Sequence, residues 1–208
     1  MANGFQFLRP FSILAIFATA LLTHTGRAQE DAPAKRVGII FEGTFEKHVN
    51  SKKPADSELT QMVPYYEWDY GVRAFDESYW TKNRFTWERI TAIAERLGDD
   101  LMEVVEPMAV RDDRGVIKYA YIKDKDPFLT SIILSKKLVE KFRDSMGDSL
   151  HVMLIDRHIV YIFPATGMPI TDYGPALVDE YRAARLPVSL EVFLVDDYGF
   201  RVIGELER

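Results

Sequence analysis

Residues 135–164 read SKKLVEKFRDSMGDSLHVMLIDRHIVYIFP, and the first half of this segment predicts an amphipathic helix. Its apolar side chains recur at steps of three and four residues, which places them on one helical face. They are Leu138, Val139, Phe142 and Met146. Ser135 stands where a serine side chain caps a free backbone N–H, and Gly147 tolerates the left-handed conformation that ends many helices. The pattern therefore predicts a helix over residues 135–146.

The second half of the segment predicts a two-stranded hairpin. Residues 150–155 are strand-like, residues 156–158 favour a turn, and residues 159–163 are apolar at every position. A strand with one face in water would alternate, so we expect this hairpin to be covered on both faces inside its sheet. Around this turn we expect His158 to pair with Ile155, and His151 with Ile162.

A similar pattern occurs earlier in the chain. Ile90, Ile93, Leu97, Gly98, Asp99 and Leu101 align with Val139, Phe142, Met146, Gly147, Asp148 and Leu150. A looser third copy combines a helix over residues 175–185 with strands over 188–195 and 200–206. We therefore predict an α+β fold with a predominantly antiparallel sheet built from repeated helix-hairpin units. Chance agreement of common helix and strand signals is the alternative.

The N-terminus resembles a secretory signal peptide over residues 1–28. Arg9 precedes an apolar run over residues 11–22, and the small residues Gly26 and Ala28 suit cleavage after Ala28. The run is shorter than the roughly 20 apolar residues that span a bilayer, although an uncleaved anchor is the alternative. We expect an exported protein, periplasmic or extracellular, with no stable membrane insertion after cleavage. Residues 29–208 are predicted to form a single α+β domain.

Composition narrows the classes of function. The chain has no cysteine, which excludes disulfides, thiolate catalysis and cysteine-ligated metals. The net charge is -6, and it becomes more negative without the leader, which carries Arg9 and Arg27 and no acid. Because nucleic acids bind basic surfaces, we expect no nucleic-acid partner.

Aromatic residues are concentrated in residues 63–87. They are Tyr65, Tyr66, Trp68, Tyr70, Phe75, Tyr79, Trp80, Phe85 and Trp87. Aromatic side chains of this kind most often pack in a core. Exposed Trp and Tyr also present rigid contact surfaces to sugars or peptides, and irregular segments often carry binding residues. The candidate ligand-binding residues are Trp68, Tyr70 and Trp80.

Four segments together resemble the YtpQ-like family of uncharacterised bacterial proteins. These are VRAFDESYWTKNRFTWERI (72–90), YAYIKDKDP (119–127), residues 135–163 and PVSLEVFLVDDYGFRV (187–202). The resemblance is one of pattern over about residues 72–206. The family has no assigned activity, so the resemblance implies no catalytic residue. Its members begin with a longer segment and no leader, so an intracellular role does not carry over to an exported chain.

Residues 147–150 read Gly-Asp-Ser-Leu, the signature of a serine esterase family, but their context argues against that chemistry. In those enzymes the serine follows a strand and leads into a helix, whereas Ser149 follows a predicted helix and leads into a predicted strand. A serine nucleophile also needs a base within reach, and no downstream Asp-x-x-His block occurs. We predict no catalytic residue here.

The histidines and paired acids also favour structural roles. His48 lies in a polar loop over residues 42–61 with no second ligand type at metal spacing, and His151 and His158 lie apart on one hairpin. The acids Asp99-Asp100, Asp112-Asp113, Asp124, Asp126 and Asp196-Asp197 fall at predicted turns, where aspartate bonds the backbone. We predict no metal site and no cofactor.

The leading interpretation is a non-catalytic exported binding or adaptor module for a protein, peptide or cell-wall ligand. Two alternatives stay open: a hydrolase with a non-standard Asp/Glu/Ser site, and a structural or oligomerising envelope protein.

Overall fold

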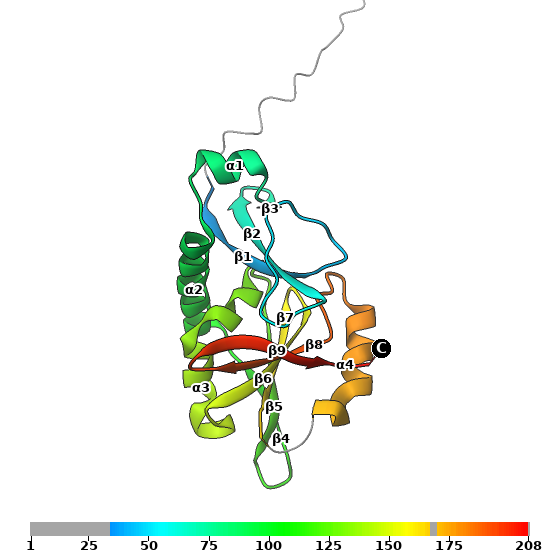
Figure 1. The fold of residues 1–208 in the computed structure, drawn as a ribbon. Coiled ribbons are helices and arrows are strands. Elements are labelled where there is room, and N and C mark those ends of the chain that lie inside the picture. Colours follow the sequence, from blue (N-terminus) through cyan, green and yellow to red (C-terminus); the bar gives the residue numbers. More distant parts are fainter. Residues whose placement is uncertain (1–33, 167–169, 208) are drawn as a thin grey trace, which may run out of the picture. The chain divides into compact units, whose positions relative to one another are not determined.

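The computed structural model describes residues 34–166 and 170–207, which form helices and two antiparallel sheets (Figure 1). The predicted α+β class with antiparallel pairing is confirmed. The predicted signal peptide, residues 1–28, lies outside the described residues. None of the helices within the described ranges combines the length and the apolar character needed to cross a membrane.

The smaller sheet has the strand order β1-β2-β3. Its strands are Arg36–Gly43, Thr60–Trp68 and Gly71–Ala74. The alternation of Val37, Ile39 and Phe41 in the sequence predicts β1, and a polar connection is predicted after it. The sequence does not predict β2. Residues 60–65 of β2 are all buried, and a strand buried on both faces lacks the alternation of polar and apolar residues by which strands are recognised.

The larger sheet has the strand order β4-β5-β7-β6-β8-β9. The strands are Met108–Arg111, Ile117–Lys123, Ser149–Asp156, Ile159–Pro164, Glu191–Asp196 and Gly199–Glu205 for β4 to β9 in chain order. The β6–β7 hairpin lies inside this sheet, as predicted. The expected register is wrong, because the turn is Arg157-His158 and places Asp156 opposite Ile159. A bulge at Ile155 takes back one residue of this shift, so His151 lies opposite Phe163, one residue from its expected partner.

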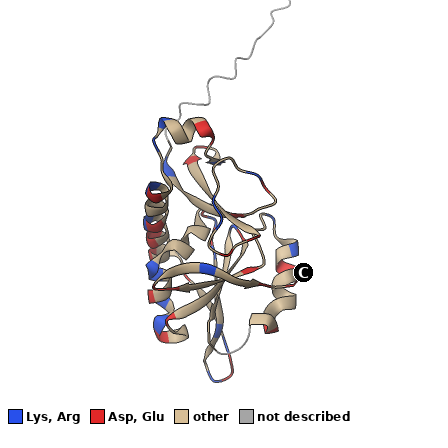
Figure 2. Ribbon diagram, viewed as in Figure 1, with Lys and Arg blue, Asp and Glu red and all other residues tan. Residues whose placement is uncertain are grey.

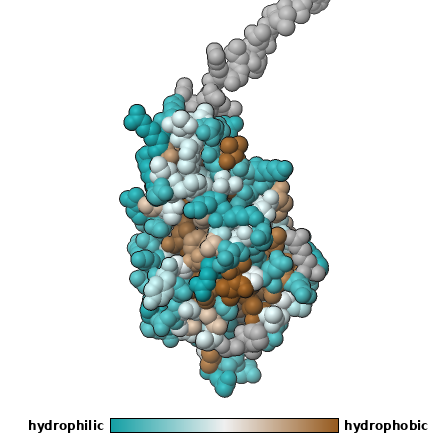
Figure 3. Space-filling model, viewed as in Figure 1, coloured by the Kyte–Doolittle hydropathy of each residue, from teal (hydrophilic) through white to brown (hydrophobic). Residues whose placement is uncertain are grey.

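The helices are α1 (Glu77–Lys82), α2 (Trp87–Val104), η1 (Leu129–Leu134), α3 (Lys136–Met146), η2 (Ile170–Tyr173) and α4 (Gly174–Ala183). α2 packs against β1 of the smaller sheet, and α3 and α4 pack against opposite faces of the larger sheet. α3 begins and ends as predicted, with the Ser135 hydroxyl accepting a hydrogen bond from the Lys137 N–H and Gly147 at φ 95°. Its apolar face shares a core with Leu150 and Val152, whereas α4 packs with Met153 and Ile155. Figure 3 shows apolar side chains reaching the surface between β9 and α4.

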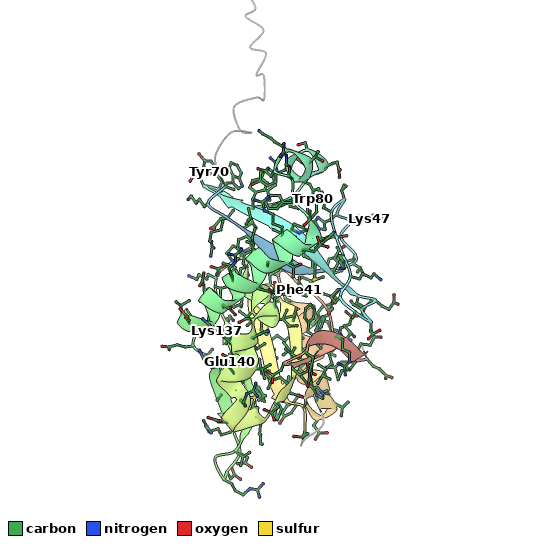
Figure 4. The ribbon with its side chains drawn as sticks, turned by 60° about the vertical axis from the view of Figure 1, so that its left-hand side comes forward. Phe41, Lys47, Tyr70, Trp80, Lys137 and Glu140 are labelled. Atoms are coloured by element: carbon green, nitrogen blue, oxygen red, sulfur yellow. The ribbon has the colours of Figure 1, made fainter. Side chains whose placement is uncertain are left out.

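Phe41 joins the two sheets into one core (Figure 4). Its ring packs 6.3 Å from that of Phe193 on β8 and 5.7 Å from that of Phe200 on β9. The outer edge of β1 is covered by η1, where the Thr130 hydroxyl accepts a hydrogen bond from the Phe41 N–H (3.1 Å) and the Ser131 hydroxyl donates one to the Ile39 carbonyl (2.6 Å). Two buried hydroxyls thus replace the bonds of a further strand.

Gly98 contradicts the alignment that predicted repeated units. The alignment assigns to Gly98 the helix-ending role of Gly147, but α2 continues past it to Val104. A Cβ at Gly98 would lie 2.6 Å from the Ser131 carbonyl oxygen, so the glycine lets α2 approach the backbone of η1. The Asp99-Asp100 pair consequently lies within α2 and not at the turn that was expected, and Asp99 accepts a hydrogen bond from the Ser135 hydroxyl.

Gly98→Ala should destabilise the fold, although alanine is normally the better helix residue by about 1 kcal/mol. The new methyl group would meet backbone that cannot rotate away, and overpacking of this kind costs about 1–3 kcal/mol. Urea unfolding followed by circular dichroism measures the change. Ala92→Gly, at an exposed position of the same helix, calibrates the helix propensity alone. A rise in stability for Gly98→Ala would contradict the close approach.

Candidate functional site

Most of the predicted aromatic segment packs against itself. The rings of Tyr66 and Tyr79 stack at 4.5 Å, and Phe75 contacts Tyr79 at 4.7 Å and Phe85 at 4.9 Å. Phe75 is 3% exposed, so it is the centre of this aromatic cluster between β2, β3, α1 and α2. For these residues the packing role explains the unusual composition.

The structure does not bring the three candidate ligand-binding residues together. Trp68 and Tyr70 form an edge-to-face pair at 4.9 Å at the β2–β3 turn, where Tyr70 is 81% exposed. Trp80 is half-buried and packs against Phe75 and Trp87, at 6.1 and 5.7 Å, and Figure 4 shows it apart from Tyr70. Of the three candidates, only the Trp68–Tyr70 pair offers an exposed aromatic surface.

Ser149, Asp112 and Asp196 lie at the positions in helix, strand and turn that the sequence predicts. Ser149 follows α3 and opens β6, and its hydroxyl has no hydrogen bond to an imidazole or a carboxylate in residues 34–166 and 170–207. Asp112 and Asp196 each accept a backbone hydrogen bond within a turn. Burial lowers the pKa of His151.

A buried polar cluster was missed at the start of the long loop. Glu42, at the end of β1, has a side chain only 3% exposed, and the loop returns Glu46 and His48 to it. His48 Nε2 lies 2.6 Å from Glu42 Oε2 and 3.5 Å from Glu46 Oε2. One ligand atom from each residue lies within 4.8 Å of the others. The expectation of an exposed His48 without ligand neighbours is therefore wrong.

Residues from distant strands hold this cluster in place. The Tyr65 hydroxyl on β2 donates a hydrogen bond of 2.8 Å to Glu42 Oε1, and the Arg157 guanidinium from the β6–β7 turn forms an ion pair with the same oxygen. Gln61 Nε2 donates to the carbonyls of Gly43 and Glu46, at 3.1 and 2.7 Å, which fixes the loop. Lys47, between the two loop ligands, marks this loop in Figure 4.

The surrounding residues supply hydrogen-bond donors to one oxygen of Glu42 but not to the other. Burial, together with the nearby Glu46 carboxylate, raises the pKa of Tyr65 to about 12, so this hydroxyl stays protonated and donates. Burial lowers the pKa of Arg157. Both groups satisfy Glu42 Oε1, whereas Glu42 Oε2 and His48 Nε2 are buried and make no hydrogen bond of acceptable geometry with any described residue. Because these two atoms lie only 2.6 Å apart, they need a hydrogen atom or a metal ion between them.

Two arrangements could meet this need. The Nε2–H of His48 could donate a hydrogen bond to Glu42 Oε2, or a divalent metal ion could be ligated by one nitrogen and two carboxylate oxygens. Imidazole and carboxylate ligands together suit Zn²⁺ and its neighbours among the first-row metals. Three protein ligands leave at least one coordination position open.

A small cavity adjoins the cluster. Its volume is about 50 Å³, and its lining includes Glu42, Glu46, Arg157, Arg185 and Phe45. It therefore places two acidic ligands and two guanidinium groups around one space.

No family model, curated protein or solved structure matches the chain. The resemblance to the YtpQ-like family stays a prediction. The site must be interpreted from its own chemistry.

The sequence did contain a signal for the cluster. Glu42, Glu46 and His48 lie within seven consecutive residues, but the spacing of four and two matches no helical or strand face. Only the path of the loop brings them together.

Proposed function

We propose that the protein is an exported binding module whose ligand is a divalent transition-metal ion held by Glu42, Glu46 and His48. The observation that carries this proposal is the pair of buried ligand atoms Glu42 Oε2 and His48 Nε2, which lie 2.6 Å apart and make no hydrogen bond with any other described residue. Buried polar atoms are costly unless they are satisfied, and a metal ion would satisfy both of them. The proposal retains the binding role expected from the sequence and replaces the expectation of no metal.

The arrangement around Glu42 supports this proposal. Arg157 and Tyr65 occupy Oε1 and leave Oε2 directed to the side of His48. In known metal sites, neighbouring residues hydrogen-bond the other oxygen or nitrogen of a ligand side chain and so fix its orientation. Arg157 and Tyr65 would do the same for Glu42. The hydrogen bonds from Gln61 fix the backbone at Gly43 and at Glu46 itself.

The aromatic pair Trp68–Tyr70 is not favoured as the binding centre. It is a surface pair without a cavity among the described pockets, and single exposed aromatic residues are normal on protein surfaces. Charges of both signs alternate over the face shown in Figure 2.

Metal binding should be measurable by titrating mature protein, first treated with a chelator, with Zn²⁺ and Co²⁺. Calorimetry should give one site, and Co²⁺ should show the visible absorption of a low-symmetry site. At a metal concentration 100-fold above Kd, the free energy of unfolding should rise by about 2.7 kcal/mol. Glu46→Gln and His48→Ala should each abolish most of this rise.

Tyr70→Ala provides the matched control, because Tyr70 is exposed and far from the cluster in the fold. It should bind metal like the parent protein. If the parent binds neither ion, Glu42 and His48 only pair with each other and the proposal is wrong.

A further inference from the structure

We propose that the metal centre binds a small oxyanion group, phosphate or carboxylate, between the metal ion and the guanidinium groups of Arg157 and Arg185. This inference rests on the proposed metal-binding function. It assigns a ligand to the cavity beside the cluster.

The cavity combines the required groups. Glu42 and Glu46 line it from the side of the metal ligands, and Arg157 and Arg185 line it from the β6–β7 turn and from the segment after α4. Phe45, Leu186 and Pro187 complete the wall with apolar surface. A ligand in this space therefore meets the metal ligands and both arginines at once.

The net charge around the cavity becomes positive when a metal binds. Without metal, Glu42 and Glu46 face the two arginines, and the carboxylates and guanidiniums balance. A divalent ion neutralises both carboxylates, which leaves the two guanidinium charges uncompensated around the cavity. Arg185 makes no ion pair or side-chain hydrogen bond with any other described residue, so its guanidinium is available to a ligand.

The size and donors of the cavity define the ligand class. A volume of about 50 Å³ accommodates one phosphate or carboxylate group and not a sugar or a nucleotide base. Guanidinium groups bind both kinds of oxyanion through paired N–H donors. One anion oxygen would take the open position on the metal, which three protein ligands leave free.

Metal and anion should therefore bind cooperatively. Each should raise the affinity for the other by the same factor, because the coupling between two sites is reciprocal. A typical coupling corresponds to a factor of about 5–150. Arg185 adds to the anion affinity alone, since it contacts no metal ligand.

The test uses mature protein with and without bound Co²⁺, and calorimetry with inorganic phosphate, acetate and phenyl phosphate as probes. We expect each oxyanion to bind the Co²⁺ form at least tenfold more tightly than the metal-free form, and to change the visible absorption of Co²⁺. If phenyl phosphate binds more tightly than inorganic phosphate, the bound oxyanion belongs to a larger ligand. If inorganic phosphate binds more tightly, the ligand is the free ion.

Arg185→Ala should weaken phosphate binding about tenfold or more without lowering the affinity for Co²⁺, and Arg185→Lys should restore part of it. Arg182→Ala is the control, because Arg182 is exposed and pairs only with Asp179 on α4. Normal Co²⁺ binding with no response to any oxyanion, or equal anion binding with and without Co²⁺, would overturn this inference and leave the metal site intact. Absence of Co²⁺ binding would overturn the proposed function itself.

Discussion

Replacing Glu42 by alanine should lower the free energy of unfolding by about 3–5 kcal/mol in metal-free buffer, because it leaves the partly buried Arg157 charge without its partner. The Arg157 side chain is 16% exposed and forms its ion pair with Glu42 Oε1. Tyr65 would lose its acceptor at the same time. Urea unfolding in the presence of a chelator measures the loss.

The double variant Glu42→Ala/Arg157→Met should be more stable than Glu42→Ala alone. Removing both charges eliminates the uncompensated cation, so the second substitution recovers part of the first loss. Glu140→Ala, at an exposed carboxylate on α3 (Figure 4), is the control and should change stability by no more than about 0.5 kcal/mol. If Glu42→Ala behaves like Glu140→Ala, the cluster contributes nothing to folding.

Replacing Glu191 by alanine should cost about 2–4 kcal/mol, because this carboxylate connects the long loop to the larger sheet. Glu191 on β8 is 2% exposed. Its Oε1 accepts hydrogen bonds from the backbone N–H groups of Glu58 and Leu59, at 2.7 and 2.9 Å, and its Oε2 accepts one from the Ser57 hydroxyl at 2.8 Å. In Glu191→Ala, the backbone amides of the β1–β2 loop should exchange faster with solvent. Urea unfolding should show the lower free energy of unfolding.

The same carboxylate should make stability depend on pH. Burial alone would raise the pKa of Glu191, but the hydrogen bonds that it accepts outweigh burial and hold the pKa below 4.5. Since the unfolded chain takes up the proton first as the pH falls, this stabilisation is complete above the ordinary pKa of 4.5 and is lost below it. The difference in unfolding free energy between the parent protein and Glu191→Gln should therefore shrink from about pH 7 to about pH 3. A constant difference would show that the charge of Glu191 has no role.

Local signals in the sequence predicted the central part of the fold. The apolar stripe of α3, the cap at Ser135 and the stop at Gly147 are interactions within a few residues, and each appears as predicted. The turn at Asp196 is local in the same way. Such features depend little on the rest of the chain.

The predictions that were wrong concern features that depend on contacts between residues far apart in the sequence. Gly98 resembles a helix stop in sequence, yet its role is set by η1, more than thirty residues later along the chain. β2 is hidden because both of its faces are covered by other elements. The polar cluster could not be predicted because Arg157, which fixes the orientation of Glu42, comes from a turn in the other sheet.

The hydroxyls of η1 also bear on how the chain avoids aggregation. A free edge strand offers its N–H and C=O groups to any other extended chain, and β1 would be such an edge. The Phe41 N–H and the Ile39 carbonyl are already engaged by Thr130 and Ser131, so a second molecule finds no partners there. Another chain can therefore pair with β1 at these positions only after η1 detaches. The two hydroxyls that complete the fold also oppose amyloid-like association through this edge.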